Sequence, residues 1–120
     1  MARARISEPD GMAAVSAALA PAASRDSTAM AVRYLLQALA DKVPGNSVEV
    51  RVPPFGAVQC IEGPRHTRGT PPNVVELDAA TWLALATGGL SWDEAAASGK
   101  VYASGTRATL DGFLPVYRPR

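Results

Sequence analysis

"DAATWLALATGGLSWDEAAASGKVYASGTRATL", residues 78–110, alternates short helical and extended patterns and decides the fold. Asp78 is a typical helix N-cap, and the helix that it begins is expected to end at Gly88. Ser91 and Glu94 have the spacing of a capping box, which predicts a second, shorter helix. The stretch is therefore built from closely spaced structural elements and places no catalytic side chain among them.

The same stretch predicts one more strand and one more helix. "KVYAS", residues 100–104, carries β-branched and aromatic residues typical of a strand. Gly105 and Thr106 favour the start of a last helix that runs through Phe113 and Leu114.

Two helices are expected upstream. Ser7 and Asp10 have capping-box spacing, and Pro21 ends the helix that they begin. A longer helix over residues 27–43, with Asp26 and Ser27 as its best cap candidates, has an apolar stripe at helical spacing. The stripe consists of Val32, Leu35, Leu36, Leu39 and Val43.

Between these regions lies a predicted hairpin. "SVEVRV", residues 47–52, alternates with period two and turns its valines to one face. A five-residue loop after Val52 pairs Val52 with Val58 and Val50 with Cys60. A slip by one residue would turn Gln59 to the apolar face opposite Val50. The slipped register is therefore rejected.

These elements predict an α+β fold. With "VVEL", residues 74–77, as a third strand, we expect a small twisted, mainly antiparallel sheet of four to five strands. The helices are expected to pack on one face of this sheet. Residues 1–6 are interpreted as a disordered basic tail, and residues 7–120 as a single domain.

Composition restricts the partners and the compartment. The formal net charge of +1 gives no general attraction to nucleic acid or acidic membranes. No apolar run is long enough for stable membrane insertion. The basic, alanine-rich start resembles a signal peptide, but Glu8 and Asp10 precede the apolar run and argue against export. Cys60 is the single cysteine, so a reducing cytoplasm is the expected compartment.

The same residue counts argue against an enzyme. His66 is the single histidine and Cys60 the single cysteine, so neither a transition-metal site nor a cofactor is expected. Ser104 lies between a strand and a predicted helix, but the sequence lacks the glycine of a nucleophile elbow, and a capping role is favoured. No two carboxylates are forced together in an apolar setting.

What remains is an apolar ligand site. The candidate ligand-binding residues come from the predicted sheet and helices and are Leu35, Leu36, Leu39, Val50, Val52, Val58, Val75, Leu77, Trp82, Leu85 and Phe113. Arg65, His66 and Arg68 lie in a long connecting loop and could hold a phosphate or carboxylate head group at the rim. A solvated loop is the favoured interpretation of these three residues, because no phosphate-binding glycine pattern accompanies them.

The stretch that decides the fold also carries a family resemblance. Its matching positions are Asp78, Trp82, Leu85, Ala86, Gly88, Ala95, Gly99, Lys100, Val101, Ser104, Gly105, Ala108 and Leu110. In their order along the chain they resemble the second half of the sterol carrier protein family, in particular its small actinobacterial branch, and the resemblance covers residues 26–116. It implies a twisted sheet covered by helices, with an apolar tunnel between the layers. It also implies carriage of fatty acids, acyl-CoA esters or other lipids without chemistry. The chain differs from the family in being short and in having no long helix after Pro115.

Two other interpretations stay open. The first is a protein-interaction module with a closed core, which binds no ligand and docks through Met30, Tyr34, Ala38 and Phe55. It predicts a homodimer or another complex. The second, an enzyme that relies on His66 or Ser104, is the least favoured.

Overall fold

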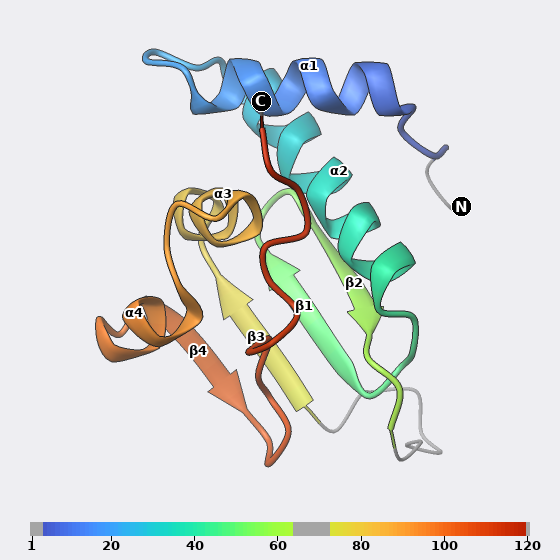
Figure 1. The fold of residues 1–120 in the computed structure, drawn as a ribbon, viewed down its shortest axis with the longest axis vertical. Helices are drawn as coiled ribbons and strands as arrows, with labels where there is room; N and C mark the ends of the chain where they lie inside the picture. Colours follow the sequence, from blue (N-terminus) through green and yellow to red (C-terminus); the bar gives the residue numbers. More distant parts are fainter. Residues whose placement is uncertain (1–3, 64–72, 120) are drawn as a thin grey trace.

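The computed structural model describes residues 4–63 and 73–119, in which helices pack on one face of a sheet (Figure 1). The elements in these ranges are α1 (Glu8–Leu19), α2 (Arg25–Lys42), β1 (Val48–Val52), β2 (Gly56–Cys60), β3 (Asn73–Leu77), α3 (Ala79–Thr87), α4 (Trp92–Ala97) and β4 (Val101–Ser104). None of these helices is long and apolar enough to cross a membrane.

The sheet has the strand order β2-β1-β3-β4. Within the described ranges, β1 pairs with β2 and β3 pairs with β4 in antiparallel fashion, whereas β1 and β3 are parallel. Two of these three pairings are antiparallel, so the predicted α+β fold with a mainly antiparallel sheet is confirmed. The sheet has four strands, which is the lower of the two predicted numbers.

The predicted hairpin register was wrong by two residues. Val50 pairs with Val58, and Val52 pairs with Gly56, so the loop has three residues instead of five. Gly56 lies beside α2, where an added Cβ would be in ordinary contact with Leu36 Cδ1 at 3.4 Å. A shift by two residues preserves the side-chain alternation, and the valines of β1 therefore face the core as predicted.

The helix caps follow the sequence closely. Ser7, Asp78 and Ser91 are N-caps as predicted, and the Ser91–Glu94 capping box is complete. Gly88 ends α3 in the left-handed region, with φ 87°. The cap of α2 is a correction: the Ser24 hydroxyl accepts from the Ser27 backbone N–H at 3.1 Å, so the helix starts earlier than predicted.

The last predicted helix is absent from the described residues. Residues 105–119, the C-terminal segment, form turns and irregular backbone that cross the front of the sheet and pass beside α3 (Figure 1). The segment is interrupted by Gly112, with φ 86°, and by Pro115. Proline removes a backbone donor and glycine weakens a helix, so these two residues outweigh the apolar spacing that favoured a helix.

The start of the described chain lies against α2. Residues 1–6 were interpreted as a disordered tail, and residues 1–3 lie outside the described ranges. The Ile6 backbone donates to and accepts from the Gln37 side-chain amide, both at 3.0 Å. Arg5 donates to both carboxylate oxygens of Asp41 at 3.2 and 2.6 Å. Residues 5 and 6 are thus held by four hydrogen bonds to one side of α2.

Candidate functional site

The predicted ligand-binding residues lie together in the core. All eleven belong to one apolar cluster or pack against it. Val58 and Phe113 are partly exposed, and the other nine are at most 2% exposed: Leu35, Leu36, Leu39, Val50, Val52, Val75, Leu77, Trp82 and Leu85. The sequence therefore identified the inner faces of α2, α3 and the sheet correctly.

Trp82 occupies the space between α2 and α3. Its indole is fully buried, and Nε1 donates to the Val32 carbonyl oxygen at 3.3 Å. This bond satisfies the polar atom of a large side chain whose remaining surface packs in the cluster. The indole thus joins α2 and α3 in the region between helices and sheet, where the resemblance to sterol carrier proteins implies an apolar tunnel.

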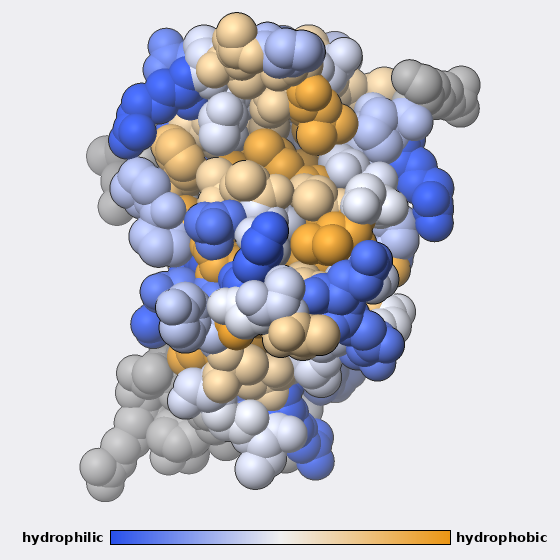
Figure 2. All heavy atoms as spheres, turned by 90° about the vertical axis from the view of Figure 1, so that its left-hand side faces the viewer, coloured by the Kyte–Doolittle hydropathy of each residue, from blue (hydrophilic) through white to orange (hydrophobic). Residues whose placement is uncertain are grey.

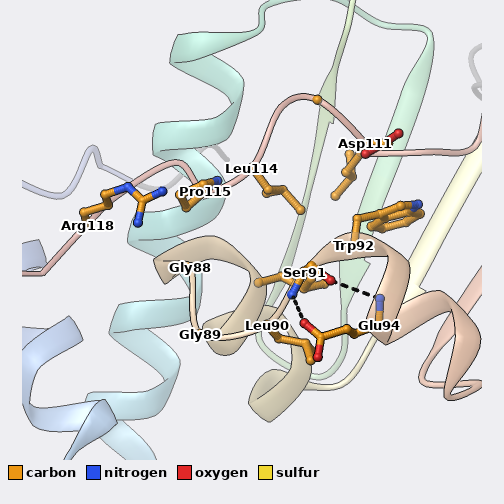
Figure 3. A pocket seen from close by; sticks show the side chains of 13 residues that line it. Gly88, Gly89, Leu90, Ser91, Trp92, Glu94, Asp111, Leu114, Pro115 and Arg118 are labelled. Atoms are coloured by element: carbon orange, nitrogen blue, oxygen red, sulfur yellow. Dashed lines mark hydrogen bonds between the residues drawn. The ribbon is translucent and has the colours of Figure 1, made fainter.

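An open cleft adjoins this core on the side of α3 and α4. It has a volume of about 340 Å³ and lies between the α3–α4 corner and the C-terminal segment (Figure 3). Its apolar residues are Leu85, Leu90, Trp92, Leu110, Leu114 and Pro115, and its polar and glycine residues are Gly88, Gly89, Ser91, Glu94, Asp111, Gly112 and Arg118. We call this the Trp92 cleft.

The Trp92 cleft is continuous with the core. Leu85 and Leu110 line it and are also fully buried members of the apolar cluster. Among the predicted ligand-binding residues, Leu85 alone lines this cleft. Figure 2, viewed from the side of α4 and β4, shows apolar surface interrupted by hydrophilic residues, so apolar side chains also reach the outer surface here.

Capping interactions fix the lower wall of the cleft. The Ser91 backbone N–H donates to Glu94 Oε1 at 3.1 Å, and the Glu94 N–H donates to the Ser91 hydroxyl at 3.1 Å (Figure 3). The hydrogen bond from the Ser91 N–H lowers the pKa of the Glu94 carboxyl. This carboxylate therefore serves the helix start and stays ionised at neutral pH.

Hydrogen bonds to neighbouring helices hold the upper wall. The backbone N–H groups of Val116 and Tyr117 both donate to the Ala86 carbonyl oxygen, at 3.0 and 3.1 Å. Lys42 Nζ donates to the Pro115 carbonyl oxygen at 3.1 Å. The Ala86 carbonyl has no partner within α3 because it lies in the last turn of the helix. The backbone of residues 116 and 117 supplies the missing hydrogen bonds.

Arg118 lies at the rim of the cleft, beside the end of α3. A Cβ added at Gly88 would lie 3.3 Å from Arg118 Nη1. A cation is favoured there because the carbonyl groups at a helix C-terminus carry partial negative charge. Asp111 lies on the opposite side of the cleft, next to Trp92 (Figure 3). The rim thus offers the Arg118 cation and, besides the capping Glu94, the exposed Asp111 carboxylate to a ligand.

The Cys60 thiol and the Asp78 carboxylate both have structural roles. Burial raises the pKa of the Cys60 thiol to about 11, so the sulfur stays protonated at neutral pH. Hydrogen bonds from Thr81 lower the pKa of Asp78, whose carboxylate caps α3. In residues 4–63 and 73–119, no group of three or more His, Cys, Asp or Glu residues could hold a metal ion.

The predicted head-group residues lie outside the described ranges. Arg65, His66 and Arg68 belong to residues 64–72, and their role at a rim stays a prediction. The sequence reasoning missed Leu90, Trp92, Leu114 and Arg118, because the cleft forms only when the C-terminal segment returns to α3. The glycine and proline of that segment were the available signal against a helix.

The residues predicted for the interaction module are partly buried by contacts within the chain. Tyr34 lies beneath α1, where a Cβ added at Gly11 would lie 2.1 Å from its ring, and it packs edge-on against Tyr117 with ring centroids 6.4 Å apart. Phe55 lies under Arg25, whose guanidinium carbon is 5.1 Å from the ring centroid. Met30, Tyr34, Ala38 and Phe55 all stay partly exposed, so the interaction surface and the homodimer stay predictions.

One comparison with known proteins gives a match. A family model described as a bacterial SCP ortholog, where SCP denotes sterol carrier protein, matches residues 24–116. The matched range begins at the N-cap of α2, includes the whole sheet with α3 and α4, and leaves α1 outside. No curated protein matches the chain.

Proposed function

Because the chain belongs to the family of bacterial sterol carrier protein orthologs, we propose that it binds and carries a small apolar or amphipathic ligand without transforming it. The ligand class is a fatty acid, an acyl-CoA ester or another lipid. The observation that carries the proposal is the Trp92 cleft, whose floor consists of the buried core residues Leu85 and Leu110.

The Trp92 cleft is proposed as the place where the ligand enters. Its volume of about 340 Å³ is at the lower end of the range usual for small-molecule sites. A chain that displaces water from Leu90, Leu114 and Pro115 gains about 0.8 kcal/mol for each buried methylene. Several methylene groups would then give measurable affinity.

The deeper part of the site is proposed to be the apolar cluster itself. The C-terminal segment closes the cluster, and a few hydrogen bonds to Ala86, Lys42 and Asn73 hold it in place. An outward movement of this segment would carry Leu110 with it and would make Leu85 accessible first, with the other predicted ligand-binding residues of α2, α3 and the sheet behind it. Arg118 would meet an acidic head group at the rim.

The absence of chemistry is part of the proposal. Glu94 and Asp78 are committed to helix caps, and the Cys60 thiol is buried and protonated. We also place the protein in the cytoplasm, because its single cysteine needs no oxidising compartment.

Titration with lipids tests this function. Trp92 lines the cleft and Trp82 lies in the core, so the variant Trp82→Phe leaves Trp92 as the only tryptophan reporter. Saturable changes in Trp92 fluorescence are expected with fatty acids, acyl-CoA esters or phospholipids at micromolar concentrations. Leu114→Asp, which places a charge in the cleft, should abolish them, whereas Ala57→Asp on an exposed position of β2 should not. If none of these ligands saturates a site on the wild-type protein, the proposal is refuted.

A further inference from the structure

A second cleft lies on α2, away from the Trp92 cleft. It has a volume of about 420 Å³ and is lined by Ala4, Arg5, Ile6, Met30, Arg33 and Gln37. It shares no lining residue with the Trp92 cleft. We call it the Arg33 cleft, and neither the family match nor the proposed function accounts for it.

Most polar groups of the Arg33 cleft already have partners. The Gln37 amide is used by the Ile6 backbone, and the Arg5 guanidinium is neutralised by Asp41. The lining residues include no carboxylate. The charge of Arg33 therefore determines the electrostatic potential inside the cleft.

Arg33 is held in place with part of its guanidinium unused. Its Nε donates to the Phe55 carbonyl oxygen at 3.2 Å, and its aliphatic stem packs over Gly56. Within residues 4–63 and 73–119, its two terminal amino groups have no hydrogen-bond or ion-pair partner. The Nε bond orients the planar group without satisfying its remaining donors. Such a fixed fork matches the two oxygens of a carboxylate.

The remaining surface of the cleft is suited to an alkyl chain. Met30 and Ile6 are partly buried and contribute flexible or branched apolar surface beside Arg33. Methionine adapts its shape to irregular apolar partners. A single uncompensated cation balances the one negative charge of a carboxylate, whereas a doubly charged phosphate would keep excess charge.

We propose that the Arg33 cleft binds an aliphatic monocarboxylate, with its carboxylate on the terminal amino groups of Arg33 and its chain along Met30 and Ile6. This site is separate from the Trp92 cleft and stands independently of the proposed carrier function. Occupancy would join residues 4–6 to the middle of α2 through a bound molecule.

Octanoate titration monitored by two-dimensional NMR tests the site. Shifts are expected at the Arg33 Nε–H and Gln37 side-chain resonances. Arg33→Gln should weaken octanoate binding at least tenfold, because it removes the charge-assisted contact. Arg51→Gln is the matched control, since it removes the same charge but does not line the cleft, and it should change affinity less than twofold.

A second variant separates binding from folding. Met30→Glu places a like charge beside the carboxylate and should also abolish binding, while thermal unfolding verifies that each variant is folded. The proposal is overturned if Arg33→Gln binds octanoate as tightly as the wild type. It is likewise overturned if octanoate shifts only resonances of the Trp92 cleft, a result that would leave the carrier function intact.

Discussion

Replacing Asn73 with alanine should destabilise the protein by about 3 kcal/mol. Asn73 is 3% exposed and joins three parts of the fold. Its Nδ2 donates to the Ser47 carbonyl oxygen at 2.9 Å, and its Oδ1 accepts from the Arg107 backbone N–H at 2.9 Å. The side chain therefore connects the start of β1 to the C-terminal segment.

The magnitude follows from the two lost bonds. Ser47 is buried, so losing the bond to its carbonyl group costs about 2 kcal/mol. Arg107 is exposed, and water can replace part of its bond, which leaves a cost of about 1 kcal/mol. For a chain of 120 residues, a total of about 3 kcal/mol lowers the Tm by about 12 °C.

Thermal and urea unfolding of Asn73→Ala measure this loss, with Asn46→Ala as a matched control. Asn46 is exposed and donates to Gln59 Oε1 at 2.7 Å, so its removal should cost less than about 1 kcal/mol. Hydrogen exchange should also accelerate at residues 105–110 of Asn73→Ala. Equal Tm values for the two variants would refute the reasoning that burial makes the Asn73 bonds important.

Three further predictions concern packing, backbone and pH. Gly11→Ala should destabilise the protein by about 2 kcal/mol in urea unfolding, because the new Cβ would lie 2.1 Å from the Tyr34 ring. Alanine usually stabilises a helix relative to glycine, so a gain in stability would contradict the packing of α1 on α2. Gly88→Ala should cost about 1–2 kcal/mol because its φ is 87°, whereas Gly89→Ala, next to it and without a left-handed φ, should cost much less. The raised pKa of Cys60 predicts that stability is complete below about pH 9 and falls by about 2 kcal/mol as the pH rises to about 11, because the unfolded state ionises first in this window. Cys60→Ala should lack this loss when unfolding is measured across the same pH range.

Local chemistry explains why most elements could be predicted from the sequence. Ser7, Asp78 and the Ser91–Glu94 pair are caps whose effect depends on the next few residues only. The alternation in β1 fixes which side chains face inward, but it is unchanged when the register moves by two residues. The hairpin was therefore predicted with correct faces and a wrong register.

Tertiary contacts explain what could not be predicted. The C-terminal segment has apolar residues at helical spacing, yet Leu110 is buried by returning to the core and not by forming a helix. The Trp92 cleft depends on this return, and the Arg33 cleft depends on Ile6 docking on Gln37. A list of apolar positions also does not reveal whether a side chain such as Trp82 fills the space between two layers.

The Ala86 carbonyl oxygen, which accepts from both Val116 and Tyr117, makes the end of α3 a single anchoring point. Fraying of the last helical turn would turn this oxygen away and release two amides in one event. Val116 and Tyr117 therefore detach from α3 together, and the frequency of this event depends on how readily the last turn of α3 unwinds.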